Sequence, residues 1–345
     1  VSTRMFPRAS RRFLNVKKTT NAKAMALFAR AYLNLHKCDG KKEYPNKALA
    51  CLTWLEKNFS KGYSGRCWGY PFDWKSLMLF PKGTPCGVVS SIAGHAFLDA
   101  YDQLGDKRYL EVAQEVCHFI LNDLNKKECD NKLCFSYTPL DDFEVHNANL
   151  WCASLLARTA SYTNNNLFKT TVVKAVNFAL NDQKDDGSWG YWSTRFSRRI
   201  RRINTIDNFH TGFMIECLNE CNTHISSINA EENIQRSLEF YVKSLLLEES
   251  IPKMTPRSIY PIDIHSCAQA IITLTRFSEK SKRYLNIAKK VAYWTIRNMQ
   301  SKEGFFGYRI YRLGTDKMPY IRWGQAWMLL ALAKLHEKTQ SITQK

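Results

Sequence analysis

The sequence lacks an apolar run as long as a membrane span, which needs ~18 residues. It also lacks a signal peptide at its start, a zinc-finger spacing and an RNA-binding signature. Only Cys129 and Cys134 are spaced like a metal-binding pair, and no second pair completes such a site. The other cysteines are scattered through the chain, many of them in apolar helical runs. We therefore expect free, buried cysteines in a reducing, cytoplasmic compartment.

Acidic residues are few relative to basic ones, with 31 Asp and Glu against 50 Lys and Arg and a formal net charge of +19. Such an excess suits nucleic acid, an anionic membrane surface or an acidic glycan. Nucleic acid is the weakest of the three because no recognition module is visible. Two basic runs, residues 1–20 and Arg195–Arg202, carry part of the charge, although each is also compatible with a solvated basic face. We expect residues 1–20 to be extended.

A helical repeat organises the chain. The segments "VNFALNDQKDDGSWGYW" and "AYWTIRNMQSKEGFFGYR" each read as an amphipathic helix that ends in Gln, an acidic turn with Gly, and an aromatic residue followed by Gly. Gln183 and Gln300 are 117 positions apart (300 − 183 = 117). That separation is two units of roughly 58 residues, within the range of repeat architectures. Similar helix ends recur in three further places, which makes five.

A second kind of helix alternates with these. Its members are apolar over most of their circumference and rich in Ala, Gly, Ser and Cys, which is typical of buried helices in close contact. The segments are "AKAMALFARAYLNLH", "VVSSIAGHAFLDAYDQL", "NANLWCASLLARTASYT", "TGFMIECLNEC", "SCAQAIITLTRF" and "WGQAWMLLALAKLH". Strand signals are weak throughout.

Alternating inner and outer helices predict an all-α protein, a closed α/α toroid of six inner and about six outer helices. An open solenoid is the alternative. The sequence shows no linker or low-complexity segment, so residues 1–345 are expected to form a single toroid domain.

Several motifs resemble known toroid families. "QKDDGSWG" is similar to the Gln-Trp repeat of terpene cyclases, and the arrangement resembles prenyltransferase β-subunits and six-hairpin glycosidases. "CWGYPFDW", "YTPLDDFEVHNANL", "IDNFHTGF", "YPIDIHSCAQAI" and "YIRWGQAWM", in this order, resemble a prokaryotic toroid family associated with cell-surface polysaccharide biosynthesis. "PLDDFE" lacks the first Asp of the acid motif of class II terpene cyclases, which argues against that reaction.

Polar and aromatic loops precede the inner helices. Because all inner helices of a toroid point the same way, these loops should converge at one end of the ring, which we call the mouth. The candidates for catalysis are Asp207, His210, Asp263 and His265. The candidates for substrate binding are Trp68, Asp73, Trp74, His146, Asn147, Asn149, Asn208, Tyr260, Arg322, Trp323 and Gln325.

Each candidate also has a structural interpretation. Asp207 and Asp263 could only cap helices, since Asp is favoured there. His210 and His265 could be core histidines with satisfied hydrogen bonds, and the tryptophans could be core rings. Capping alone, however, does not explain a His two or three residues after each Asp.

Two kinds of acid–base chemistry suit the mouth. Glycoside hydrolysis needs two carboxylates about 5 to 9.5 Å apart, and Asp73, Asp207 and Asp263 are available. Elimination or epimerisation at C5 of a uronate needs a base, an opposing acid and a group that neutralises the carboxylate. The candidates of those types are His146, Asn147, His210, His265, Tyr260 and Arg322.

No cofactor is expected. A minority alternative is a mixed Asp/His zinc site built from Asp207, His210, Asp263, His265 and His146. The leading hypothesis is a cytoplasmic, or membrane-peripheral, carbohydrate-active enzyme that acts on an anionic oligosaccharide or lipid-linked glycan, with a glycosyltransferase as a further partner. The alternatives are an isoprenoid enzyme and a non-catalytic scaffold that binds glycan.

Overall fold

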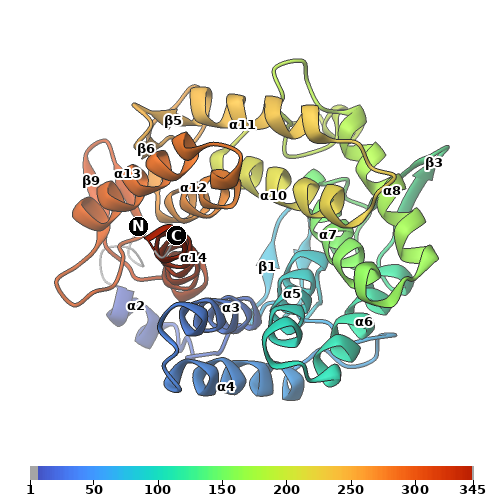
Figure 1. Ribbon diagram of the computed structural model, residues 1–345, viewed down its shortest axis with the longest axis horizontal. Coiled ribbons are helices and arrows are strands. Elements are labelled where there is room, and N and C mark those ends of the chain that lie inside the picture. The colour runs from blue at the N-terminus through green and yellow to red at the C-terminus, as the bar shows by residue number, and fades with distance from the viewer. Residues whose placement is uncertain (1–6, 344–345) are drawn as a thin grey trace.

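A computed structural model describes residues 7–343, which form a closed ring of two concentric layers of helices (Figure 1). Neighbouring inner helices contact each other around the ring, and the contact between the last and the first closes it. The inner helices are α3 (Ala22–Asp39), α5 (Gly87–Leu104), α7 (His146–Thr163), α10 (Asn208–His224), α12 (Ile264–Arg276) and α14 (Ala326–Thr343). The outer helices are α4 (Glu43–Lys57), α6 (Lys107–Asn122), α8 (Asn166–Asn181), α11 (Glu231–Leu245) and α13 (Lys282–Met299). The toroid is confirmed, with five outer helices in residues 7–343 where about six were expected.

The other elements are short and lie between the ring helices. The short helices are α2 (Pro7–Phe13), α9 (Thr194–Arg199), the 3₁₀ turn η1 (Phe277–Glu279) and the π-helical turn η2 (Ile321–Gln325). The strands are β1 (Trp74–Lys75), β2 (Leu79–Phe80), β3 (Lys126–Cys129), β4 (Lys132–Phe135), β5 (Leu246–Leu247), β6 (Ile251–Pro252), β7 (Ile262–Asp263), β8 (Arg309–Tyr311) and β9 (Gly314–Asp316). All strand pairs are antiparallel. The expectation of an extended N-terminal segment is wrong over α2, and residues 1–6 lie outside the described part.

Small residues bring the inner helices close together, as the sequence predicted. A Cβ atom on Gly94 of α5 would lie 2.5 Å from a Leu155 methyl group of α7. A Cβ atom on Gly212 of α10 would lie 2.6 Å from Cγ of Gln269 on α12. Any side chain larger than hydrogen at these two positions would push neighbouring inner helices apart, because protein interiors are close-packed.

The repeated turns have the same structure in both copies. The side-chain amide of Gln183 donates to the carbonyl of Gly187 at 3.2 Å, and that of Gln300 donates to Gly304 at 2.9 Å. Both glycines have positive φ, 85° and 90°, which only glycine adopts without strain. The Gln-to-Gly spacing of the repeat is therefore a device that ends an outer helix and turns the chain inward.

The connections have two very different lengths. The chain passes from each inner helix to the next outer helix through a short turn, such as residues 40–42 and 105–106. It passes from each outer helix to the next inner helix through a long segment, such as residues 58–86 and 182–207. All long segments precede inner helices and therefore gather at the mouth. The small sheets, η2 and α9 belong to these long segments, so the mouth carries most of the irregular structure of the ring.

Candidate functional site

Asp207 and His210 form a hydrogen-bonded pair at the start of α10. One carboxylate oxygen of Asp207 accepts the backbone N–H of His210 at 3.0 Å and caps the helix. The other lies 2.7 Å from Nδ1 of the same imidazole. A carboxylate on Nδ1 fixes the ring orientation and the tautomer that leaves Nε2 as a base. The side chain of His210 is 22% exposed, so this base is accessible at the mouth.

His265 lies beside this pair in an aromatic cage. Its ring stacks on Phe209 with centroids 4.5 Å apart, and it also contacts Phe213 at 5.5 Å and Trp327 at 5.1 Å. Burial, reinforced by the positive charges of nearby basic residues, holds the pKa of His265 well below its usual range. Its Nε2 has no hydrogen-bond partner among the described residues. His265 is thus a neutral imidazole near neutral pH.

Both carboxylate oxygens of Asp263 accept hydrogen bonds from neighbouring groups. One carboxylate oxygen caps α12 by accepting the backbone N–H of His265 at 2.8 Å, and the other accepts Nε of Arg309 at 2.5 Å. The side chain is 2% exposed. Burial raises the pKa of Asp263, and Arg309 opposes that rise. A carboxylate with both oxygens bound suits positioning of the α12 start better than proton transfer.

Lys23 is a cation at the mouth that was not among the residues predicted from the sequence. It is the second residue of α3, it is 5% exposed, and its Nζ lies 5.5 Å from the Trp327 ring. Burial, followed by the charge of Arg322, lowers the pKa of Lys23 to about 7. No carboxylate of the described residues forms an ion pair with it. A lysine in the first turn of a buried helix opposes the helix dipole, and that signal could have identified it.

Arg322 is a second mouth cation without a carboxylate partner among residues 7–343. Its guanidinium lies over Tyr70, Phe72 and Trp323, with centroid distances of 4.5, 5.1 and 4.2 Å. Stacking of this kind leaves the N–H donors at the edge of the guanidinium available. Together with Lys23, it places two cations without carboxylate partners in the described part of the mouth.

Three tyrosines complete this region: Tyr70 is buried, and Tyr137 and Tyr191 are half-buried. Burial raises the pKa of Tyr70 to about 12 and that of Tyr137 well above its usual range. The ring of Tyr191 lies 4.7 Å from that of His210, and burial together with the charge of Asp207 raises its pKa above the usual range. All three therefore remain protonated and can only donate or accept hydrogen bonds near neutral pH.

Several predicted binding residues instead connect the inner and outer layers. Asn149 accepts from the Phe135 backbone and donates to the Ala175 carbonyl. Asn208 donates to the carbonyl of Leu245 and accepts from the Tyr241 hydroxyl. Both amides point outward, so they hold helices together rather than face the mouth.

His146 and Trp68 also lie within the wall of the ring. Nε2 of His146 is 3.2 Å from Asp182, and its ring packs on Phe178 of the outer helix α8. Trp68 is 1% exposed and donates its indole N–H to the Leu55 carbonyl.

Of the remaining candidates, Gln325 clamps the loop before α14 by two hydrogen bonds to the Phe306 backbone. Asp73 accepts the backbone N–H of Lys82 in an exposed hairpin, and Tyr260 is 42% exposed.

Two of the other three candidates, Trp74 and Trp323, belong to ring contacts, and the third is Asn147. Trp74 stacks on Phe80 at 4.2 Å, and Trp323 stacks on Tyr308 at 5.7 Å. Asn147 is buried, and its side-chain oxygen has no partner among the described residues. The structure thus brings together Asp207, His210, His265 and Arg322, and holds Asp263 just behind them.

The geometry does not support the zinc alternative. Within residues 7–343, no three His, Cys, Asp or Glu side chains converge as metal ligands would. His146 faces α8, and Asp263 is bound to Arg309. All 11 cysteines are free, and most are buried, so Cys129 and Cys134 do not form a disulfide.

The basic run Arg195–Arg202 lies in the long segment that leads to Asp207. Arg195 pairs with Glu144 at 2.6 Å and Arg199 with Asp142 at 2.9 Å. The other three arginines of the run, Arg198, Arg201 and Arg202, are exposed and make no ion pair in the described part.

Replacing Arg198, Arg201 and Arg202 with Gln should weaken binding of an anionic glycan and flatten its dependence on salt, because exposed charges act through a screened long-range field. Affinity measured between low and high ionic strength checks this. Arg199, which is already neutralised by Asp142, should contribute less. An unchanged affinity at low salt would contradict a guiding role for the run.

No protein-family model matches the chain, and no curated protein matches its sequence. Solved structures match its fold. A cellobiose 2-epimerase from Bacillus thermoamylovorans superposes with a TM-score of 0.70 at 12% identity, over 93% of this chain and 88% of that one. An α-mannanase from Bacteroides thetaiotaomicron gives 0.73 at 11% identity, over 96% and 90%. An unsaturated glucuronyl hydrolase specific for heparin gives 0.65 at 11% identity, over 94% and 87%.

These likenesses define the class of fold. The chain has the α/α toroid of six-hairpin glycosidase-like enzymes, which confirms that part of the sequence resemblance. Among the described residues, no helix combines the length and apolar character needed to cross a bilayer.

Proposed function

We propose that this protein is a carbohydrate-active enzyme that transfers a proton at C5 of a uronate in an anionic glycan, leading to epimerisation or elimination. The observation that carries the proposal is the Asp207–His210 pair beside two cations without carboxylate partners, Lys23 and Arg322. The fold likenesses to a sugar epimerase and a glucuronyl hydrolase support a sugar and a uronate as substrate.

The reaction begins with removal of a proton. Nε2 of His210 takes the proton from C5, the electron pair moves into the uronate carboxylate, and Asp207 stabilises the imidazolium that forms. Lys23 and Arg322 neutralise the extra negative charge on the carboxylate. Return of a proton to the opposite face of C5 gives the epimer. Loss of the oxygen substituent at C4 as an alcohol, protonated by a mouth acid, gives the unsaturated uronate instead.

Hydrolysis suits the mouth less well. It requires one carboxylic acid and one carboxylate that are both free to face the glycosidic bond. Asp263 is bound by Arg309 and a backbone N–H, Asp73 holds a turn, and Asp207 is bound to His210. The groups available for proton transfer are therefore imidazoles and an amine. The same polar set argues against an isoprenoid substrate, which would need an apolar, aromatic lining.

We place this activity in cell-surface polysaccharide production, at the cytoplasmic side or the periphery of a membrane, with a lipid-linked glycan as the form of the substrate. The support is the sequence resemblance of five ordered segments to a family with that association, together with the net charge of +19. A glycosyltransferase is the partner that would supply such a glycan.

Solvent exchange tests the reaction. Uronate-containing oligosaccharides incubated with the protein in D₂O should gain deuterium at C5, seen by NMR, or should develop the ultraviolet absorbance of an unsaturated uronate. His210→Gln should abolish both signals, and the exposed outer-helix variant His118→Gln should retain them. New reducing ends without exchange at C5 would establish hydrolysis and contradict the proposal. Binding without any reaction would favour the scaffold.

The pKa of Lys23 predicts a pH effect on binding. Because this pKa is lowered to about 7, the amine carries its charge below that pH and loses it as the pH rises. Affinity for an anionic sugar should therefore fall by roughly tenfold between pH 6 and 8.5, which is the effect of losing one charge-assisted hydrogen bond. Lys23→Arg remains charged and should bind equally at both pH values. An identical fall in Lys23→Arg would assign the titration to another group.

A further inference from the structure

A polar cavity lies at the end of the ring opposite the mouth. Its volume is about 450 Å³, within the ~300–1,000 Å³ of small-molecule sites. All of its main polar side chains come from the middle or second half of inner helices, one or two turns beyond the mouth residues. We call it the basal pocket and define it by Arg30, His95, Trp151, Glu216, Arg276 and Lys334.

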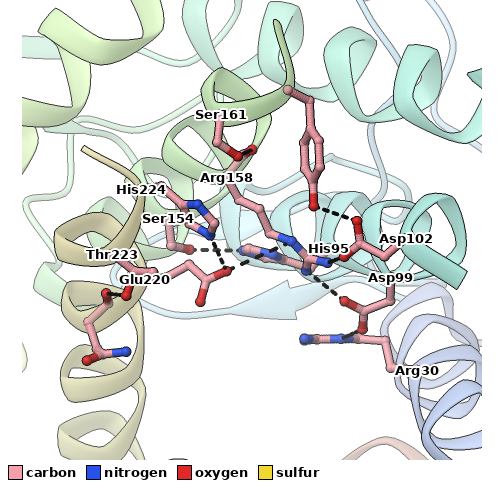
Figure 2. A network of polar contacts seen from close by, with 12 residues as sticks. Arg30, His95, Asp99, Asp102, Ser154, Arg158, Ser161, Glu220, Thr223 and His224 are labelled. Atoms are coloured by element: carbon pink, nitrogen blue, oxygen red, sulfur yellow. Dashed lines mark hydrogen bonds and ion pairs between the residues drawn. The ribbon is translucent and has the colours of Figure 1, made fainter. Parts of the chain in front are cut away.

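A network of ion pairs shapes one side of this pocket (Figure 2). Asp99 accepts Nε of Arg30 and Nη1 of Arg158, each at 2.7 Å. Asp102 accepts Nη2 of Arg158 at 2.6 Å, and Glu220 accepts Nη2 of Arg276 at 2.5 Å. These carboxylates are therefore already neutralised, and they hold the guanidinium groups in fixed orientations.

Three basic side chains at the pocket have N–H groups that donate no hydrogen bond within the described part of the chain. Lys334 has no hydrogen-bond or ion-pair partner in the described part of the chain. Arg30 and Arg276 each use only one N–H group on a carboxylate, which leaves their other donors available. Burial, followed by the charges of Arg30 and Arg276, lowers the pKa of Lys334. Glu216, which accepts hydrogen bonds from Gln269 and Thr273, is the carboxylate that acts on all three cations. A bound anion would add further negative charge beside the three cations on helices α3, α12 and α14 and would reduce their mutual repulsion.

Two buried side chains offer unsatisfied polar atoms to the same pocket. Ser154 donates its hydroxyl to the Trp151 carbonyl at 2.9 Å, so its oxygen accepts Nε2–H of His95 at 3.1 Å. Nδ1 of His95 is then an unprotonated acceptor, in keeping with a pKa lowered to about 3 by burial. It has no partner among the described residues, and neither has the indole N–H of Trp151. The side chains of His95 and Trp151 are 3% and 7% exposed.

One unpaired acceptor and one unpaired donor, beside three cations, suit a ligand that carries hydroxyl groups as well as a negative charge. A hydroxyl can donate to Nδ1 of His95 and accept from the indole of Trp151. Buried polar atoms of this kind are costly unless they are paired, so their presence indicates a site built for a polar ligand.

From this geometry we infer that the basal pocket binds a small anionic sugar, with a phosphate or carboxylate held by Arg30, Arg276 and Lys334 and ring hydroxyls held by His95 and Trp151. This site is separate from the mouth. The rings of Trp151, Phe213 and Trp327 lie between the two. Trp151 contacts Phe213 edge-on at a centroid distance of 5.5 Å, and Phe213 contacts Trp327 in a tilted arrangement at 5.1 Å. It does not depend on which reaction the mouth performs.

Calorimetric titration of the full chain tests this inference with four probes: glucose 6-phosphate, glucuronate, glucose and inorganic phosphate. At least one of the two anionic sugars should bind, more tightly than glucose and inorganic phosphate. The better anionic sugar identifies phosphate or carboxylate as the natural group. Lys334→Gln should weaken its binding by about 10-fold to 100-fold, the effect of removing a charged hydrogen-bond donor. Trp151→Phe, which keeps an aromatic ring, should weaken the sugar phosphate but not inorganic phosphate.

Matched variants separate the two ends of the ring. Lys338 lies one turn beyond Lys334 on α14 and is already paired with Glu279 at 2.6 Å, so Lys338→Gln should bind as the wild type does. Lys23→Gln alters only the mouth and should also retain binding. Binding that Lys23→Gln loses and Lys334→Gln keeps would overturn the inference. So would inorganic phosphate binding as tightly as the better of the two anionic sugars, or no binding of either anionic sugar.

Discussion

Asp207→Asn is expected to lower turnover on the true glycan by about 10²–10⁴-fold, the usual contribution of a general acid or base. Asparagine caps a helix as well as aspartate does, so the cap on the His210 backbone N–H should survive. The amide, however, cannot stabilise an imidazolium, and it can turn its NH₂ towards Nδ1 and favour the wrong tautomer. The protein should therefore melt near the wild-type temperature while losing most of its activity.

The control for this experiment is another aspartate cap. Asp106 caps the outer helix α6 by accepting the backbone N–H of Arg108 at 2.9 Å, far from the mouth. Asp106→Asn should change neither melting temperature nor rate. Parallel measurements of thermal unfolding and of deuterium exchange at C5 distinguish the two roles. If Asp207→Asn were as active as Asp106→Asn, Asp207 would be only a cap and His210 would need no partner.

The fold could be predicted from the sequence because it is encoded by local patterns repeated many times. Each inner helix is apolar on nearly all sides, and each outer helix carries one charged face, so every segment indicates its own layer. The Gln183 and Gln300 turns show how close the correspondence is, since the same side-chain bond to a glycine carbonyl recurs in both. The extended N-terminal segment was wrong over α2, a short stretch with no periodic pattern long enough to identify it.

The site could be predicted only in part. Loops before inner helices must meet at the mouth, and the structure brings Asp207, His210, His265 and Arg322 together there. The direction of a side chain at the first turn is not visible in a sequence, however. Asn208 turns outward to α11, whereas His210, two residues later, faces the mouth.

Functional residues inside long helical segments were not identified from the sequence. Lys334 carries no local signal in the sequence, and Lys23 has only its position in the first turn of a buried helix. The closure of the ring brings each of them beside other cations. The basal pocket has the same origin, because its polar groups come from separate helices across the whole chain. Its three arginines, Arg30, Arg158 and Arg276, come from different helices more than 100 positions apart, so they form no recognisable motif.

The second large effect is expected at the ion pair that supports α12. Asp263 is 2% exposed and Arg309 is 22% exposed, and they are joined at 2.5 Å across the β7–β8 pairing. Removing one partner of a buried ion pair typically costs ~3–5 kcal/mol, because the other charge is left uncompensated. Arg309→Gln should therefore lower the free energy of unfolding by about 3 kcal/mol at neutral pH, the lower end of that range because Arg309 is partly solvated.

The loss should depend on pH in a defined direction. Burial already raises the pKa of Asp263, and without Arg309 nothing opposes that rise except the backbone bond to His265. The folded state of Arg309→Gln then binds a proton that the unfolded state releases at lower pH. Its stability deficit should be small near the unfolded pKa of ~4 and should grow as the pH rises through the folded pKa.

Chemical denaturation of Arg309→Gln at pH 5 and pH 7 measures both effects. Arg312→Gln is the matched control, because Arg312 lies on the same hairpin, is exposed and forms no ion pair in the described residues. The double variant Asp263→Asn with Arg309→Gln should recover part of the loss, since neither charge then remains buried alone. If Arg309→Gln unfolded at the same denaturant concentration as Arg312→Gln, the pair would contribute nothing to stability. Asp263 would then again be a candidate proton donor at the mouth.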